Sequence, residues 1–103
     1  MPEITSLDGL TKTPHAEVFD EHRPRAVRLR LGAGERVPEH RHPGTNVVLH
    51  LVSGRLELAL DGETHELEPG QLVRFGGERE VSPRAIEAST AVVVFAPATD
   101  DTG

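Results

Sequence analysis

A run of alternating leucines that ends in Asp61-Gly62 limits the folds open to this chain more than any other feature. Leu56, Leu58 and Leu60 recur at every second position, the period at which side chains of a β-strand fall on one face. An Asp-Gly pair favours the two-residue turn that joins antiparallel strands, because both turn positions need a positive φ. The leucine run and the polar stretch 63–68 therefore predict a β-hairpin with one buried face.

Further apolar runs of strand length occupy much of the remaining chain. They are separated by glycine, proline and serine, and no segment keeps the 3.6-residue period of a helix. The runs are residues 26–31, 46–52, 71–75 and 91–95, with a short one at 84–87. Ser53-Gly54 is expected to form a turn between the run 46–52 and the leucine run. Many short strands with regularly spaced turns predict an all-β chain that closes into a barrel or a sandwich.

Composition narrows the classes of partner. The chain has 103 residues and three phenylalanines but no tryptophan or tyrosine, so one domain with a single aliphatic core is expected. It has no cysteine, which excludes disulfides, thiolate catalysis and cysteine-bound metal sites. The net charge of −6 argues against nucleic acid, and the lack of a polybasic segment argues against anionic membranes. No signal peptide or membrane-spanning run is apparent, and a cytoplasmic location is expected.

The segment His40-Arg41-His42 is the strongest candidate for a functional site. Two histidines at i and i+2 of an extended strand point to the same side, with Cα atoms about 6–7 Å apart. Both imidazoles are then close enough to meet one ion or one ligand. Neutral imidazole is the commonest side-chain metal ligand. The pair therefore indicates a metal or ligand site.

The stretch from Gly34 to Gly54 resembles the first motif of the cupin family. That motif is a glycine, five residues, His-x-His, three or four residues, a glutamate, six residues and a glycine. This chain has the glycines and His40-Arg41-His42 at the right spacing. The glutamate is replaced, because its position falls on Val47 or, with the shorter spacing, on Asn46.

A second cupin motif is matched in part. Pro69-Gly70 and the following residues to Phe75 resemble its start, and its histidine position falls on Val81. The resemblance implies a double-stranded β-helix, or jelly-roll barrel. Residues 24–97 would form this barrel, with an N-terminal arm and edge strand at 1–23 and a polar tail at 98–103.

The resemblance also implies a metal centre, of which two ligands carry over. The expected ligands are His40 and His42, with Asn46 as a weaker amide-oxygen ligand. A divalent transition metal such as Zn²⁺, Ni²⁺, Mn²⁺ or Fe²⁺ suits two imidazoles completed by oxygen and water. The competing interpretation is a remnant pair that no longer binds metal.

The other histidines and the arginines are expected to lie away from this site. His50 should face away from the barrel interior, because it alternates with the apolar positions of its strand. His15, His22 and His65 are expected to be exposed in polar surroundings. An anion site could be lined by Arg23, Arg25, Arg28 and Arg30, but arginines that alternate on an outward face usually form a solvated face with glutamate partners.

Three functions remain open from the sequence. The first is a small cupin that binds a metal ion or a small molecule in the barrel through His40 and His42. It is expected to form a homodimer, because the run 47–52 is apolar except for His50. The second is a metal-dependent enzyme of the dioxygenase, isomerase or decarboxylase type. The third is a metal-free cupin with a ligand-sensing or structural role.

Overall fold

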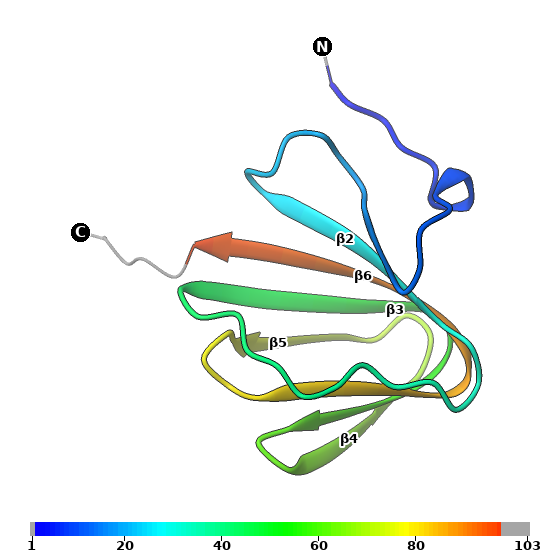
Figure 1. The fold of residues 1–103 in the computed structure, drawn as a ribbon, viewed down its shortest axis with the longest axis vertical. Coiled ribbons are helices and arrows are strands. Elements are labelled where there is room, and N and C mark those ends of the chain that lie inside the picture. The colour runs from blue at the N-terminus through cyan, green and yellow to red at the C-terminus, as the bar shows by residue number, and fades with distance from the viewer. Residues whose placement is uncertain (1, 98–103) are drawn as a thin grey trace.

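Two long strands organise the structure, and four shorter strands are arranged around them (Figure 1). The computed structural model describes residues 2–97, so the predicted polar tail at 98–103 lies outside the described residues. The elements are a 3-10 turn, η1 (Leu7–Gly9), and the strands β1 (His15–Glu17), β2 (Arg25–Leu31), β3 (Thr45–Leu60), β4 (Glu63–Leu67), β5 (Leu72–Gly76) and β6 (Val81–Pro97). All strand pairs are antiparallel, which confirms the prediction of an all-β chain. Within residues 2–97, no helix has the length and apolar character needed to cross a membrane.

The two long strands pair with each other along almost their whole length. Their ladder runs from Thr45 opposite Pro97 to Leu60 opposite Val81. β2 pairs with the second half of β6, and β1 pairs with β2. The other edge of β3 carries β5 on its first half and β4 on its second half. The sheet order is β1-β2-β6-β3-β4, with β5 also on β3.

Both long strands are divided in the sequence-based prediction but continuous in the structure. The predicted turn at Ser53-Gly54 is wrong, because β3 runs through it with irregular pairing to β6. Gly54 has a φ of +89° and lies so close to the Ala88 backbone that no Cβ would fit, so this glycine marks a bulge. The predicted separation of 84–87 from 91–95 is also wrong, since β6 spans both.

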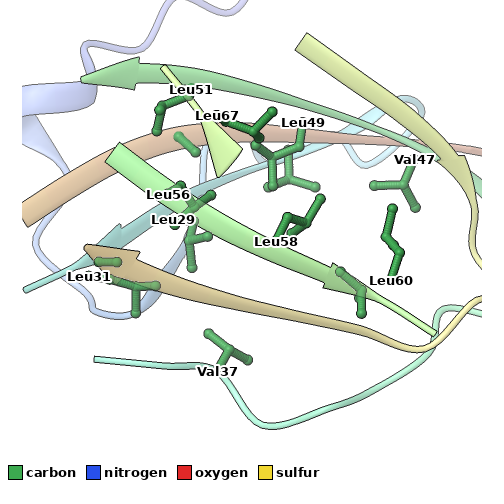
Figure 2. Close-up of a cluster of buried hydrophobic side chains, with 14 of the residues drawn as sticks. Leu29, Leu31, Val37, Val47, Leu49, Leu51, Leu56, Leu58, Leu60 and Leu67 are labelled. Atoms are coloured by element: carbon green, nitrogen blue, oxygen red, sulfur yellow. The ribbon is translucent and has the colours of Figure 1, made fainter. Parts of the chain in front are cut away.

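The core is aliphatic and follows the predicted alternation. Buried leucines and valines from β2, β3, β4 and β6 form one cluster, to which Phe75 of β5 is added. Figure 2 shows side chains such as Leu49 and Leu58, from the two halves of β3, gathered between strands that surround them. The hairpin at Asp61-Gly62 is confirmed, with a positive φ at both residues.

The outer face of β2 is covered by the N-terminal segment, which corrects the expectation of a solvated arginine face. Arg28 is 0% exposed. Its guanidinium donates hydrogen bonds to the backbone carbonyls of Leu7, Leu10 and Lys12, at 3.3, 3.4 and 2.7 Å. Arg30 is exposed as expected. The hydrogen bonds of the buried Arg28 guanidinium therefore hold the segment before β1 against the outer face of β2.

Candidate functional site

A cavity of about 320 Å³ opens between the strands that carry the core. Apolar side chains from β2, β3, β5 and β6 form most of its wall, among them Val27, Leu49, Phe75 and Val93. Its polar residues are three histidines and one arginine: His15, His40, His42 and Arg25. A mostly apolar cavity with a few polar groups is the usual form of a small-molecule site.

The segment that carries His40 and His42 runs beside the first half of β6. The backbone N–H of His40 donates to the Val81 carbonyl at 3.0 Å, and the N–H of Val81 donates back to the His40 carbonyl at 2.9 Å. The N–H of His42 donates to the Gly77 carbonyl at 2.7 Å. The two imidazole rings lie 4.7 Å apart, edge to face at 88°. The expectation that both histidines share one side is confirmed.

The hydrogen bond of His40 determines which of its ring nitrogens is free. Its Nδ1 lies 2.8 Å from the carbonyl oxygen of Pro38, and a carbonyl oxygen can only accept. Nδ1 therefore carries the hydrogen, and Nε2 of the neutral ring has a free lone pair. The backbone thus orients this imidazole and leaves one nitrogen for a ligand.

His42 is packed against an aromatic ring at the cavity mouth. Its ring centre is 4.8 Å from that of Phe95, and the Arg25 guanidinium lies 5.2 Å from the same Phe95 ring. Burial lowers the pKa of His42, and the nearby His40, Arg25 and His15 lower it further. The folded protein therefore favours the neutral form of His42 more than a free histidine would.

His15 is the cavity residue that the sequence did not reveal. β1 places it opposite Leu29 of β2, and it lines the cavity although its side chain is also exposed to solvent. Its pKa is lowered by burial first and then by His40 and Arg25, while Glu17 raises it. A three-residue strand shows no alternation, so the sequence had no signal for this placement. His22 and His65 were expected to be exposed, and they are.

Arg25 is the second such cavity residue, and it belongs to the arginine series for which the sequence favoured a solvated face over an anion site. It begins β2, and its Nε and Nη2 donate to the carboxylate of Glu17, with an Nε–Oε2 distance of 2.9 Å. The pair lowers the pKa of Glu17 and raises that of Arg25, mainly through this hydrogen bonding. Glu17 does not line the cavity. The arginine is thus held in place by a partner outside the cavity.

The donor set does not fit a metal centre of three or more protein ligands. Among residues 2–97, no group of three or more histidine, cysteine or acidic side chains is disposed to hold a metal ion. Val47 and Val81, where the resemblance has a glutamate and a histidine, both line the cavity and offer no donor atom. The structure brings His40 and His42 together but not Asn46, because Asn46 alternates with the cavity residue Val47 on β3. Two imidazoles remain as protein donors.

The strand that follows the histidine pair faces as predicted. Val47, Leu49 and Leu51 are buried in the barrel, and His50 alternates with them on the outer face of β3. Across this outer face, His50 lies between Leu72 of β5 and Val92 of β6. His50 therefore does not contribute to the cavity.

Comparison with solved structures supports the same architecture. KdgF from Halomonas sp. superposes with a TM-score of 0.81, 20% identity and full coverage of both chains. The cupin domain of Cnp3 from Schizosaccharomyces pombe gives a TM-score of 0.81 at 17% identity, over 89% of this chain and 72% of that one. An RmlC-like cupin from Shewanella frigidimarina NCIMB 400 gives 0.78 at 16% identity, over 100% and 97%. At these identities the likeness establishes the jelly-roll fold.

Sequence comparison adds a short match and a family. The chain is 50% identical over 38 residues to "Polyketide synthase CurC" from Streptomyces cyaneus. That match covers 37% of this chain and only a quarter of the length of that relative. The family model for the cupin domain matches residues 27–96, which is more than half of the chain. This small β-barrel protein therefore belongs to the cupin domain family.

Proposed function

We propose that this cupin binds a small organic molecule in its barrel cavity, with His40 and His42 as polar contacts. The observation that carries the proposal is the cavity of about 320 Å³, whose wall is mainly aliphatic and aromatic. This volume lies at the lower end of the range for small-molecule sites. The free Nε2 of His40 is available for a hydrogen bond to the ligand. A compact, mostly apolar molecule suits this wall.

The small number of metal-donor side chains in the cavity wall favours this proposal over the metal-dependent alternatives. Two imidazoles are fewer than the three protein ligands that catalytic metal sites usually keep, and the valines at positions 47 and 81 add none. A dioxygenase, isomerase or decarboxylase would depend on a divalent ion held by His40 and His42 alone. Ligand binding without metal requires no residue beyond those that line the cavity. The short match to a polyketide synthase adds polyketide-like compounds to the candidate ligands.

A thermal-shift screen on metal-free protein tests the proposal. The screen uses neutral, acidic and basic organic fragments, and then Zn²⁺, Ni²⁺, Mn²⁺ and anaerobic Fe²⁺. We expect organic fragments to raise the melting temperature of the wild type, because a ligand that binds only the folded state stabilises it. The His40→Ala/His42→Ala variant should lose this shift. The matched control His22→Ala/His65→Ala removes two exposed imidazoles outside the cavity and should keep it.

Two outcomes would contradict the proposal. The first is the absence of any shift with organic fragments. The second is a near-stoichiometric amount of metal in untagged wild-type protein, measured by elemental analysis. This metal and any thermal shift caused by the fragments would both be lost in the His40→Ala/His42→Ala variant. That result would favour the metal-dependent alternative, and oxygen-consumption assays would follow. Mass spectrometry of the recovered fragments shows whether they are bound unchanged or converted.

We also propose that the chain forms a homodimer through the outer face of β3, β5 and β6. On this face Leu72 is 62% exposed and Val52 is 41% exposed. Val48 of β3 lies between Val94 of β6 and Arg74 of β5. Val48, Val92 and Val94 are only half-buried. Exposed apolar side chains gathered on one face of a sheet are typical of an interaction surface. A second copy of the chain offers the same apolar face in return.

A further inference from the structure

The cavity wall contains groups of one charge type only. His15, His40, His42 and Arg25 are the ionisable residues that line it, and each is neutral or cationic. No aspartate or glutamate of the described residues 2–97 lines the cavity. The chain has 17 acidic residues against 11 basic ones and a net charge of −6. The cavity is therefore opposite in charge character to the chain as a whole.

Arg25 is fixed at the cavity with donor capacity to spare. Glu17 accepts hydrogen bonds from Nε and Nη2, and the Phe95 ring lies beneath the guanidinium at 5.2 Å. Neither contact uses Nη1, which has two hydrogens to donate. A guanidinium held on two sides loses little freedom when it binds a ligand. Carboxylates are the small groups that it recognises best.

The histidines reinforce this preference for an anion. His15 and His42 line the same cavity as Arg25, and the His42 ring and the Arg25 guanidinium both contact the Phe95 ring, at 4.8 and 5.2 Å. A cation in the cavity would face the Arg25 guanidinium and no carboxylate of the described cavity wall. An anion would be attracted by that guanidinium and could accept hydrogen bonds from ring N–H groups of His15 and His42, whereas Nε2 of the neutral His40 ring can only accept. The aliphatic wall formed by Val27, Leu49 and Val93 is then left to contact the rest of the molecule.

We propose that the ligand is a small monocarboxylate with an apolar body, whose carboxylate contacts Arg25, His15 and His42 and whose body packs against the aliphatic wall. This inference rests on the proposed function, because it names the class of molecule that the cavity binds. Arg25 and His15 are assigned as determinants of specificity. The assignment of Arg25 as a specificity determinant does not depend on whether His40 and His42 bind a metal.

Ligands that share one body and differ in their head group test the inference. Isothermal titration calorimetry at pH 7 on metal-free protein compares cyclohexanecarboxylate, cyclohexanecarboxamide and cyclohexylmethylamine, and the same three heads on a hexyl chain. We expect the carboxylate to bind about tenfold or more tighter than the amide, as a charge-assisted hydrogen bond does relative to a neutral one. The amine should bind more weakly than the amide.

Two arginine variants locate the effect. Arg25→Gln should abolish the preference for the carboxylate over the amide, while Arg25→Lys should retain it. The control Arg30→Gln removes the same charge from the same strand at an exposed position outside the cavity, and should change neither affinity. Circular dichroism melts verify that each variant folds. If Arg25→Gln does not fold, Arg25→Lys and the head-group series decide the question.

The outcomes separate this inference from the proposed function. Amide and carboxylate binding with equal affinity would overturn the anionic head and leave the binding function standing. Stronger binding of the amine would do the same. The absence of binding by all six compounds would overturn both. A carboxylate preference that persists in Arg25→Gln would overturn the assignment of Arg25.

Discussion

Arg28 shows at the scale of one residue how this barrel stabilises its N-terminal segment. The side chain faces away from the barrel interior, which agrees with the alternation of its strand, yet it is completely buried. Three backbone carbonyls of residues 7–12 accept its hydrogen bonds. Sequence alternation predicts which side of a strand a residue occupies. It does not predict what covers that side, because here the cover is a segment whose only regular element is the short 3-10 turn η1.

Replacing Arg28 should therefore destabilise the protein far more than replacing its neighbour Arg30. Arg28→Ala would leave three carbonyls without their donor and create a void, at an expected cost of about 2–4 kcal/mol in the free energy of unfolding. Arg30→Ala removes an exposed arginine of the same strand and should change it by less than about 0.5 kcal/mol. Urea denaturation of both variants measures the difference. Equal effects would show that the buried hydrogen bonds add no net stability.

At the scale of the element, the sequence predicted strands better than it predicted where they end. The alternation of Val47, Leu49 and Leu51 with polar or outward residues placed the buried face of β3 correctly. The error at Ser53-Gly54 arose because glycine and serine favour turns in short segments, whereas here the partner strand β6 continues on the other side. Long-range pairing overrode the local signal. His15 was missed for the related reason that its short strand has no pattern of its own.

The close approach at Gly54 gives a prediction for this bulge. Gly54 and Gly70 have nearly equal φ values of +89° and +90°, but only Gly54 lies against another backbone. Gly70→Ala should cost about 1 kcal/mol, from the strain of a positive φ alone. Gly54→Ala should cost at least about 2 kcal/mol more, because β3 and β6 have to separate to admit the methyl group. Thermal or urea unfolding of the two variants measures the difference, and equal costs would contradict the close approach.

At the scale of the whole molecule, the predicted fold and family are confirmed, whereas the function stays a proposal. The all-β fold and the cupin family followed from alternation and from the spacing around His40 and His42, and both are now established. The site was predicted only in part. Two of its polar residues, His15 and Arg25, come from the start of the chain and reach the cavity through β1–β2 and β2–β6 pairing, which no local motif records.

The proposed homodimer is a property of the whole molecule and has a direct test. Light scattering after size exclusion should give twice the 11.2 kDa mass of the chain at micromolar concentration. Leu72→Glu places a charge on the proposed interface and should give the monomer mass. Ile86→Glu alters an exposed apolar residue on the first half of β6 and should leave the dimer intact. This half of β6 pairs with the second half of β3, whereas β5 pairs with the first half. A monomer for the wild type would refute the dimer.

The pairing of β2 and β3 with the last strand also bears on how the chain folds during synthesis. β2 and β3 are complete by residue 60, but both pair with β6, which ends at Pro97. The contacts that close the barrel therefore join residues far apart in the sequence, and such contacts form slowly. A ribosome extends the chain at about 5–20 residues per second. The histidines of the cavity are thus synthesised seconds before β6, the strand that completes their surroundings. Until β6 has been synthesised, the apolar faces of β2 and β3 lack the partner strand that closes the barrel.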